Sequence, residues 1–196
     1  MIAIVDYGAG NIRSVENALK RLGAPYTLTS DAEEIRRADH VVLPGVGEAS
    51  SAMAALSASG LDTLLKSLTQ PVLGICIGLQ LLCSFSEEGG TDCLGIFQPS
   101  VVRFPSCPGV KIPHTGWDTV GGLRGPLFKG VPDGSFVYYV HSYCPALSAA
   151  QTIAVTEYAG VSFSAALQKD NFFGTQFHPE KSGPVGAAIL KNFIEL

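Results

Sequence analysis

The stretch Pro71-Val72-Leu73-Gly74-Ile75-Cys76-Ile77-Gly78-Leu79-Gln80 decides the fold that we expect for this chain. A short apolar run ends at Gly74, one reactive thiol lies between two glycines, and a helical pattern follows. This order is typical of a nucleophile elbow, a sharp turn from a buried strand into a helix. Glycine is needed at positions 74 and 78 because such a turn leaves no room for Cβ atoms there. The stretch therefore predicts a central strand that presents Cys76 at the edge of a sheet.

The elbow favours nucleophilic chemistry at Cys76 for two physical reasons. A thiol at a helix N-terminus meets the positive end of the helix dipole, which favours the thiolate. The backbone N–H of Ile77 is also free to donate a hydrogen bond to a developing oxyanion. The alternative is a buried structural cysteine that happens to lie between two glycines, because cysteine is often buried and inert.

Composition predicts a single α/β domain that spans residues 1–196. Hydrophobic residues make up 46% of the chain and charged residues only 15%, so much of the chain must be interior. That balance fits a sheet covered by helices on both faces. The formal net charge is -4 and no cluster of basic residues is present, which disfavours nucleic-acid binding.

Cysteine usage and the N-terminal sequence indicate a cytoplasmic protein. The five cysteines are odd in number and include no Cys-x-x-Cys pair, which is typical of free thiols in a reducing compartment. A zinc site built from Cys93, Cys107, His114 and Cys144 matches no known ligand spacing, so we expect neither a metal nor a cofactor. The run 1–6 lacks a basic segment and reads as a strand rather than a signal peptide. No apolar run approaches the roughly 18 residues that span a membrane.

Hydrophobic patterning predicts an open mixed sheet, mostly parallel, with flanking helices. The expected strands of the first half are 2–5, 26–29 and 40–43, and the expected helices are 12–22, a segment ending at Arg37, 48–58 and 61–68. A capping box, Ser30-Asp31-Ala32-Glu33, opens the helix that ends at Arg37. A Gly-x-Gly at 8–10 lacks the third glycine and the acid of a dinucleotide site, so we interpret it as a turn.

The second half has shorter strands separated by glycine and proline. We expect the runs 101–104, 136–140 and 152–155 to be antiparallel or mixed strands laid on the sheet edge, not further parallel units. The segments 161–168 and 172–177 pair as a hairpin, and a final helix begins at Gly183-Pro184.

The loop Pro44–Gly47 ends the third expected strand and contains two glycines. Backbone N–H groups of Gly45, Val46 and Gly47 can come close to a ligand oxygen, which makes this loop a candidate second half of an oxyanion site. The alternative is a plain turn from strand to helix.

A cysteine nucleophile needs a base, and the base needs a third group that orients it. His178 follows a strand, so it reaches the same sheet edge as Cys76, and Glu180 can hold one of its ring nitrogens. His141 also ends an apolar run but has no acid nearby in the sequence. His40 begins a strand, at the opposite edge, and His114 lies between prolines and glycines, where we expect a surface position.

Two motifs together, Gly-Ile-Cys-Ile-Gly-Leu-Gln at 74–80 and Gln-Phe-His-Pro-Glu at 176–180, resemble the class I (triad) glutamine amidotransferases. Within that family, the whole chain is similar to the glutaminase subunits of imidazole glycerol phosphate synthase, which act in histidine biosynthesis. The resemblance rests on five stretches: 6–11 (Asp-Tyr-Gly-Ala-Gly-Asn), 44–47, the elbow, 113–117 (Pro-His-Thr-Gly-Trp) and 178–182 (His-Pro-Glu-Lys-Ser).

The resemblance implies a role for each matching residue. Cys76 attacks the side-chain amide of glutamine, His178 protonates the leaving ammonia, and Glu180 orients His178. The N–H of Ile77 and the loop at 45–47 stabilise the oxyanion, and loss of one donor costs on the order of 3 kcal/mol of barrier. The positions of Gln80, Ser142 and Tyr143 are similar to those that hold the amino-acid end of the substrate.

The resemblance also implies a partner, a (β/α)8-barrel cyclase subunit that receives the ammonia and forms a heterodimer with this chain. Asn11, Trp117 and Lys181 match interface positions. Trp117 has an alternative as a core residue. The chain departs from the family at Asp118, where asparagine is usual, and at Pro99-Ser100, which replaces an expected glycine.

Two other functions remain as alternatives. One is the glutaminase of another pathway, such as pyridoxal phosphate or aminobenzoate synthesis, against which the stretches at 6–11 and 113–117 argue. The other is a non-catalytic scaffold that binds a barrel protein. The presence of cysteine, histidine and glutamate together argues against a scaffold, and thiol labelling distinguishes the two because only an active site makes one cysteine hyper-reactive.

Overall fold

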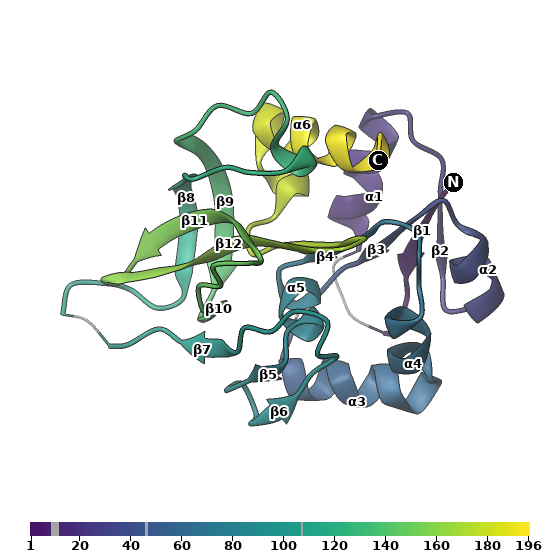
Figure 1. Cartoon of the computed structure of the whole chain (residues 1–196), viewed down its shortest axis with the longest axis horizontal. Helices are drawn as coiled ribbons and strands as arrows, with labels where there is room; N and C mark the ends of the chain where they lie inside the picture. Colours follow the sequence, from purple (N-terminus) through teal and green to yellow (C-terminus); the bar gives the residue numbers. More distant parts are fainter. Residues whose placement is uncertain (9–11, 46, 107) are drawn as a thin grey trace.

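The fold is described from a computed structural model that covers residues 1–8, 12–45, 47–106 and 108–196. A seven-stranded sheet runs through the molecule, with helices on both of its faces and two smaller sheets at one end (Figure 1). Asn11, Val46 and Cys107, which the sequence analysis singled out, lie outside the described residues.

The strands of the large sheet are β1 (Ile2–Val5), β2 (Tyr26–Thr29), β3 (His40–Leu43), β4 (Val72–Ile75), β11 (Thr152–Tyr158), β12 (Val161–Lys169) and β13 (Phe172–Thr175). Their order across the sheet is β11-β12-β13-β4-β3-β1-β2. The five strands from β13 to β2 are mutually parallel, and β12 and β11 continue the sheet as antiparallel strands. The expected open, mostly parallel sheet is confirmed, with the strand before the elbow at its centre.

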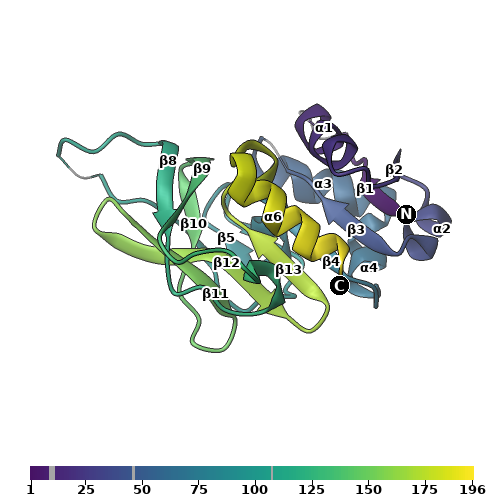
Figure 2. The ribbon, with the colours of Figure 1, turned by 90° about the horizontal axis from the view of Figure 1, so that it is seen from above.

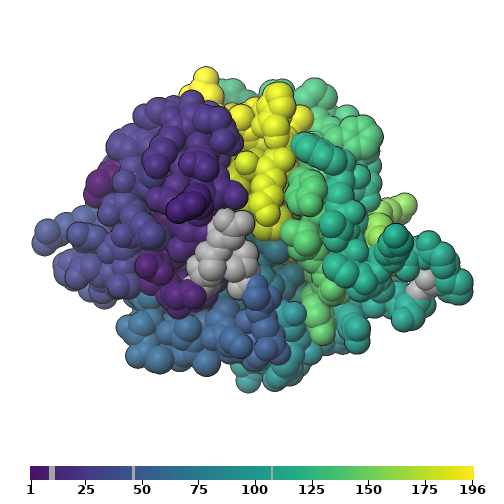
Figure 3. Space-filling model, turned by 180° about the vertical axis from the view of Figure 1, so that it is seen from behind, coloured from purple at the N-terminus to yellow at the C-terminus, as the bar shows by residue number. Residues whose placement is uncertain are grey.

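Helices pack on the two faces of this sheet, most of them through one apolar side, whereas the helix at 77–82 is buried along its whole length. The helices are α1 (Arg13–Arg21), α2 (Ala32–Arg37), α3 (Ala49–Ser59), α4 (Leu61–Lys66), α5 (Ile77–Leu82) and α6 (Gly183–Ile194). In Figure 1, α1 and α6 lie above the sheet, and α3, α4 and α5 lie below it. Figure 2 shows α6 lying over the sheet near β4 and β13. Figure 3 shows the first and last parts of the chain side by side on one face of the molecule.

The expected elements of the first half are confirmed to within about two residues, but one detail is wrong. The capping box does not begin at Ser30. Asp31 is the N-cap of α2, and its carboxylate accepts hydrogen bonds from the N–H groups of Glu33 and Glu34, both at 2.9 Å. A carboxylate accepts these two donors as well as a serine hydroxyl does, and it adds a favourable charge at the helix N-terminus.

The second half differs from the sequence analysis in its smaller sheets. The strand at 152–155 extends the edge of the large sheet as expected, and so does the hairpin of β12 and β13. The other short strands do not join it. β9 (Ser135–His141) pairs with β8 (His114–Val120) in a two-stranded sheet. A separate four-stranded sheet has the order β10 (Tyr143–Pro145), β7 (Val101–Arg103), β5 (Phe85–Ser86) and β6 (Thr91–Asp92). The expectation that all three runs lie on the sheet edge is therefore wrong for 101–104 and 136–140.

The strand β8 was missed because its sequence gives a weak strand signal. His114-Thr115-Gly116-Trp117-Asp118 follows a proline-rich segment and contains a glycine, features that are typical of loops. Its buried and exposed positions alternate, as in a strand with one face on the core. Only its pairing with the apolar β9, seven residues long, makes it a strand.

Two short 3₁₀ helices complete the described fold, η1 (Pro126–Phe128) and η2 (Pro179–Lys181). The carboxyl ends of the parallel strands β1, β3, β4 and β13 point to the same edge of the sheet, which is where open α/β sheets bind ligands. The elbow follows β4, and η2 follows β13 by three residues. None of the helices in the described ranges has the length and apolar character that crossing a membrane requires.

Candidate active site

Cys76 occupies the turn between β4 and α5 in a backbone conformation that L-residues rarely adopt, with φ 54° and ψ -110°. Close packing explains the two flanking glycines. A Cβ atom at Gly78 would overlap the carbonyl oxygen of Leu43, and one at Gly74 would come within 2.6 Å of the carbonyl oxygen of Gly78. The prediction of a strained elbow that requires glycine at 74 and 78 is confirmed.

The sulfur of Cys76 lies in a polar pocket although only 4% of the residue is exposed. The Gln176 side-chain amide points its Nε2 at the sulfur from 3.7 Å, and the thiol lies 3.9 Å from the carbonyl oxygen of Val140. The first N–H groups of α5, beginning with Ile77, have no acceptor within the helix. Ile77 directly follows the nucleophile in the chain and lines the same pocket, so its N–H can donate to an oxyanion formed there.

His178 lies in the same pocket and is held by Glu180. Its Nδ1 is 2.7 Å from Oε1 of Glu180, and both side chains are about 95% buried. The His178 N–H donates to the carbonyl oxygen of Tyr138 at 2.9 Å, which fixes the residue against β9. Because Nδ1–H donates to the carboxylate, Nε2 is the nitrogen that faces the pocket, and among the described residues it has no hydrogen-bond partner.

The electrostatics of His178 favour its protonated form. Burial opposes a charge on the ring, but the Cys76 sulfur and the Glu180 carboxylate attract that charge, the carboxylate also accepts the Nδ1 proton, and together they raise the pKa of His178 to about 10. At neutral pH the ring is therefore an imidazolium that carries a proton on the nitrogen facing the pocket.

A pocket of about 350 Å³ joins these groups, a size that suits a small molecule. Its lining consists of Gly45, Gly47, Cys76, Ile77, Gln80, Glu88, Pro113, Val140, His141, Ser142, Tyr143, His178 and Lys181. The structure thus brings together the described residues that we predicted for catalysis, the oxyanion site and substrate binding, apart from Glu180, which lies behind His178.

The loop after β3 packs directly on the elbow. A Cβ atom at Gly45 would come within 2.6 Å of Cβ of Ile77 and would overlap the backbone nitrogen of Gly78. Gly47 has a φ of 96°, which glycine adopts at no steric cost. The buried Tyr7 hydroxyl donates to the carbonyl oxygen of Pro44 at 2.8 Å, so the start of the loop is anchored to the end of β1. Of the three loop residues predicted for the oxyanion site, Val46 is outside the described residues.

Gln80 connects the elbow helix to the opposite wall of the pocket. Its Nε2 donates to the carbonyl oxygen of Tyr143 and to Oε1 of Gln176, both at 2.9 Å. Its own Oε1 is buried without a partner among the described residues, so it is available as an acceptor for a donor that enters the pocket.

Sequence reasoning missed several residues at the site. Glu88 lines the pocket, and its Oε2 accepts the N–H of Ala49 at the start of α3, at 2.9 Å. Burial raises the pKa of the Glu88 carboxyl. The turn-rich sequence around Glu88 gives no signal for this position, because only tertiary packing returns the loop to the sheet edge. Gln176 was visible only as part of the motif at 176–180.

His114 and His141 also differ from expectation. His114 is 4% exposed, not on the surface, and His141 lines the pocket although it is not paired with the thiol. The Nε2 of His141 instead lies 3.0 Å from Nδ1 of His114. His40 begins β3 at the opposite end of the sheet, as expected.

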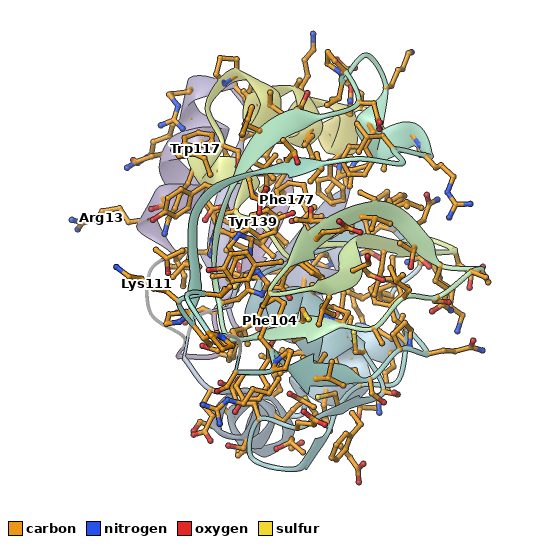
Figure 4. All side chains as sticks on the ribbon, turned by 90° about the vertical axis from the view of Figure 1, so that its left-hand side faces the viewer. Arg13, Phe104, Lys111, Trp117, Tyr139 and Phe177 are labelled. Carbon is orange, nitrogen blue, oxygen red and sulfur yellow. The ribbon has the colours of Figure 1, made fainter. Side chains whose placement is uncertain are left out.

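Two of the residues predicted for the partner interface, Trp117 and Lys181, are among those that the structure describes. Trp117 is 55% exposed, so its alternative as a core residue is wrong. Figure 4 shows it near the edge of the molecule, whereas Tyr139 and Phe177 lie in the interior. Lys181 lines the pocket with its Nζ 5.9 Å from the ring of Tyr138, which neighbours Trp117. Asn11 is outside the described residues.

The cysteines do not form a metal centre in the part of the chain that the structure describes. No group of three or more His, Cys, Asp or Glu side chains there could hold a metal ion. Cys76, Cys83, Cys93 and Cys144 are free thiols. Burial raises the pKa of the Cys83, Cys93 and Cys144 thiols above the ordinary value, which disfavours their thiolates.

Comparison of the sequence with known families and proteins gives a consistent result. Residues 3–196 match the family model described as glutamine amidotransferase class-I. A protein named imidazole glycerol phosphate synthase subunit HisH, from Bacteroides fragilis, is 56% identical over 196 residues, which is 100% of this chain and 99% of that protein. Proteins of the same name from Bacteroides thetaiotaomicron and Methanosarcina acetivorans are 53% and 48% identical, over 100% of this chain and 99% and 98% of their own lengths.

Solved structures share the fold at low sequence identity. A crystal structure of a protein titled glutamine amidotransferase superposes with a TM-score of 0.76 at 15% identity, covering 100% of this chain and 98% of that one. The crystal structure of a putative GMP synthase component from Thermoplasma acidophilum has a TM-score of 0.75 at 23% identity, over 99% and 92% of the two chains. These likenesses concern the fold alone.

Proposed function

Because this chain belongs to the class-I glutamine amidotransferase family, we propose that it hydrolyses L-glutamine to glutamate and ammonia, as the glutaminase subunit of an imidazole glycerol phosphate synthase in histidine biosynthesis. One observation carries the proposal. A cysteine at a strained elbow shares a pocket with a buried histidine that is paired to a buried glutamate.

In the first half of the reaction, the thiolate of Cys76 attacks the side-chain carbonyl carbon of glutamine. The carbon–nitrogen bond breaks as Nε2 of His178 gives its proton to the leaving nitrogen, which departs as ammonia. The raised pKa of His178 means that this proton is in place before the attack. The products of this half are a thioester on Cys76 and a neutral His178.

In the second half, water hydrolyses the thioester. Neutral His178 takes a proton from the water, the oxygen attacks the thioester carbonyl, and the carbon–sulfur bond breaks to release glutamate and the thiolate. Glu180 keeps the ring in one orientation and stabilises its positive charge in both halves, through the 2.7 Å contact.

The oxyanion of each tetrahedral intermediate needs donors that are fixed in advance. The Ile77 N–H at the start of α5 is one donor, since it adjoins the nucleophile on the pocket side. We assign the second donor to the loop at 45–47, which packs against Ile77 and Gly78. Its glycines allow the backbone to approach the elbow more closely than any other residue would.

The rest of the pocket suits the amino-acid end of glutamine. Glu88 is the one carboxylate among the described lining residues, so it is the natural partner of the α-ammonium group. The unpaired Oε1 of Gln80 offers a further acceptor. Ser142 and Tyr143 lie on the opposite wall, where their backbone and hydroxyl groups can bind the α-carboxylate.

The chain acts within a complex in this proposal. The relatives are named as subunits of a synthase, and the partner we propose is a (β/α)8-barrel cyclase subunit that takes the ammonia and makes imidazole glycerol phosphate and aminoimidazole carboxamide ribotide. The exposed Trp117, Lys181 at the pocket rim and Asn11 are the proposed contacts of a heterodimer. We place the complex in the cytoplasm, in keeping with the free thiols of the described cysteines.

The test is glutamate release from glutamine by the purified chain, alone and with the barrel cyclase and a ribotide ligand. Cys76→Ala is the blank. Activity that requires the partner and disappears in the variant is the expected result. Activity that ignores the partner would keep the chemistry and overturn the synthase assignment. No activity in either condition, with equal thiol reactivity at all cysteines, would support the scaffold function.

A further inference from the structure

Behind the pocket wall, Asp118, His114 and His141 form a chain of hydrogen-bonding groups that ends at the pocket. Oδ2 of Asp118 is 3.2 Å from Nε2 of His114, whose Nδ1 is 3.0 Å from Nε2 of His141. Nδ1 of His141 is 2.8 Å from the carbonyl oxygen of Tyr143. That oxygen also accepts the Nε2 of Gln80 at 2.9 Å.

Aromatic packing fixes both imidazole rings, so their partners are set. The ring of His114 is stacked between Tyr158, with centroids 3.8 Å apart, and Tyr139, at 4.6 Å. Phe104 packs against both histidines from the side. Figure 4 shows Phe104 and Tyr139 in the interior of this region. Neither ring can turn without displacing these neighbours.

The chain of contacts needs more protons than two neutral rings hold. Each of its three contacts requires one proton between the two heavy atoms. The carboxylate of Asp118 and the carbonyl of Tyr143 only accept, so all three protons must come from the histidines. Two neutral imidazoles carry two protons in total. One of the three contacts is therefore left without a proton, unless the pair is positively charged.

Burial keeps the histidine pair neutral at physiological pH. Burial lowers the pKa of His114, against the attraction of Asp118, and it lowers the pKa of His141 to about 3, with further repulsion from His114 and His178. The other titratable groups that face the pair are the phenols of Tyr139 and Tyr158. Their hydroxyl groups are engaged elsewhere, with Thr156 and with the carbonyl of Lys111.

The contact with Asp118 and the contact with the Tyr143 carbonyl therefore compete for the same ring proton. The 3.0 Å contact between the two buried rings needs a proton of its own, because two lone pairs would otherwise face each other there. With that proton in place, donation by His114 to Asp118 leaves a lone pair of His141 facing the Tyr143 carbonyl, and donation by His141 to Tyr143 leaves a lone pair of His114 facing Asp118. The Asp118 side chain is 29% exposed, so water can relieve repulsion there but not at the buried end.

We propose that Asp118, His114 and His141 act as a positioning relay, in which the charge of Asp118 weakens the hold of His141 on the Tyr143 carbonyl and so adjusts the wall that binds the amino-acid end of glutamine. This inference rests on the proposed function. It assigns no contact with the reacting atoms to the two histidines. Asparagine at position 118 removes the competition, because its amide N–H donates to His114 and leaves both ring protons for the other two contacts.

The first experiment counts the protons on the rings and does not depend on catalysis. In the whole chain with ¹⁵N-labelled histidine, ring nitrogen shifts are followed by NMR from pH 8 to pH 5 in the wild type and in Asp118→Asn. We expect Asp118→Asn to change the tautomer signals of both His114 and His141 at pH 8. We also expect the third proton to bind at a lower pH in the variant, because the attracting charge is gone.

Asp92→Asn is the matched control, because it removes the same charge from an exposed residue of β6, away from the pair. It should leave all four ring shifts of the pair unchanged. If Asp118→Asn changes the ring-nitrogen shifts of His114 and leaves those of His141 as they are in the wild type, the relay is overturned. This holds whether or not the chain proves to be a glutaminase.

The second experiment separates binding from chemistry. Completing one buried hydrogen bond should lower KM for glutamine about threefold to tenfold in Asp118→Asn, with little change in kcat, assayed with the partner present. In the wild type, KM should fall at acid pH, below the ordinary range of histidine, where the third proton binds the pair and completes the hydrogen bonds. The variant should lose that dependence. Equal KM values and equal pH profiles in the two proteins would contradict the proposal.

Discussion

The pocket has two walls that are held by different forces. The elbow wall, residues 45 and 76–78, is fixed by contact between backbones so close that a Cβ atom does not fit. The strand wall, residues 138–143 with His114 behind them, is fixed by hydrogen bonds between polar groups that are buried in an aromatic cluster. Both walls face the same 350 Å³ space.

The difference suggests a division of labour. Close backbone packing permits only one conformation, and that conformation does not depend on pH. This suits the nucleophile and the oxyanion donors, because small displacements of these groups slow the reaction. Hydrogen bonds between titratable groups have more than one arrangement of protons, so the strand wall can adjust.

Replacing the nucleophile on the elbow wall should abolish the reaction. In Cys76→Ala, kcat/KM for glutamine should fall roughly 10⁴-fold or more, while the thermal unfolding midpoint stays close to that of the wild type. The measurement is glutamate release from glutamine in the presence of the proposed partner.

Cys83→Ala is the control for that experiment. Cys83 follows α5, is fully buried and has a raised thiol pKa, so it should change stability but not catalysis. An equal loss of activity in the two variants would mean that Cys76 is not distinguished from a structural cysteine.

Adding one methyl group to the elbow wall should destabilise the fold itself. Gly78→Ala places a Cβ on the Leu43 carbonyl oxygen, and we expect a loss of more than about 4 kcal/mol in the free energy of unfolding. Gly121→Ala is matched, since its Cβ would meet only the Asp133 carboxylate at an ordinary 3.7 Å. Urea denaturation compares them, and equal effects would contradict steric fixation of the elbow.

Glu180→Gln should disturb the electrostatics of the site while preserving its shape. We expect kcat to fall about 10³- to 10⁴-fold, because the amide no longer stabilises the imidazolium. In the wild type, the pKa of His178 is raised to about 10, so its proton stabilises the fold fully below pH about 6.5. That contribution is lost as pH rises through 10.

The free energy of unfolding by urea, measured at pH 6, 8 and 10, checks this dependence. The wild type should lose stability across the range, and Glu180→Gln should lose less, because one of the groups that raises the pKa is gone. Both proteins contain Cys76, so its own titration affects both curves. Parallel curves would show that Glu180 does not hold the proton of His178.

The outer face of the strand wall should contribute least to the stability of the isolated chain. Trp117→Ala removes a side chain that is more than half exposed, so the free energy of unfolding should change by no more than about 0.5 kcal/mol. Association with the proposed barrel cyclase, measured by titration calorimetry, should weaken markedly. Unchanged association would place the partner on a different face.

Much of this molecule was predictable from patterns that are local in the sequence. The continuous apolar runs of β1, β3 and β4 marked buried parallel strands, and the glycines at 74 and 78 marked the elbow, because each signal depends on a few adjacent residues. The pair His178 and Glu180 was also predictable, since two residues of one turn can meet without help from the rest of the fold.

The tertiary structure alone decided which polar groups pair in the strand wall. His114 and His141 are 27 residues apart, and β8 is a strand only because β9 lies beside it. Glu88 reaches the pocket through a cap on α3, 39 residues away. A buried hydrogen bond between distant residues leaves no periodicity in the sequence, because it needs one polar atom at each end and nothing regular in between. Steric and periodic constraints could therefore be predicted from the sequence, and the pairing of distant polar groups could not.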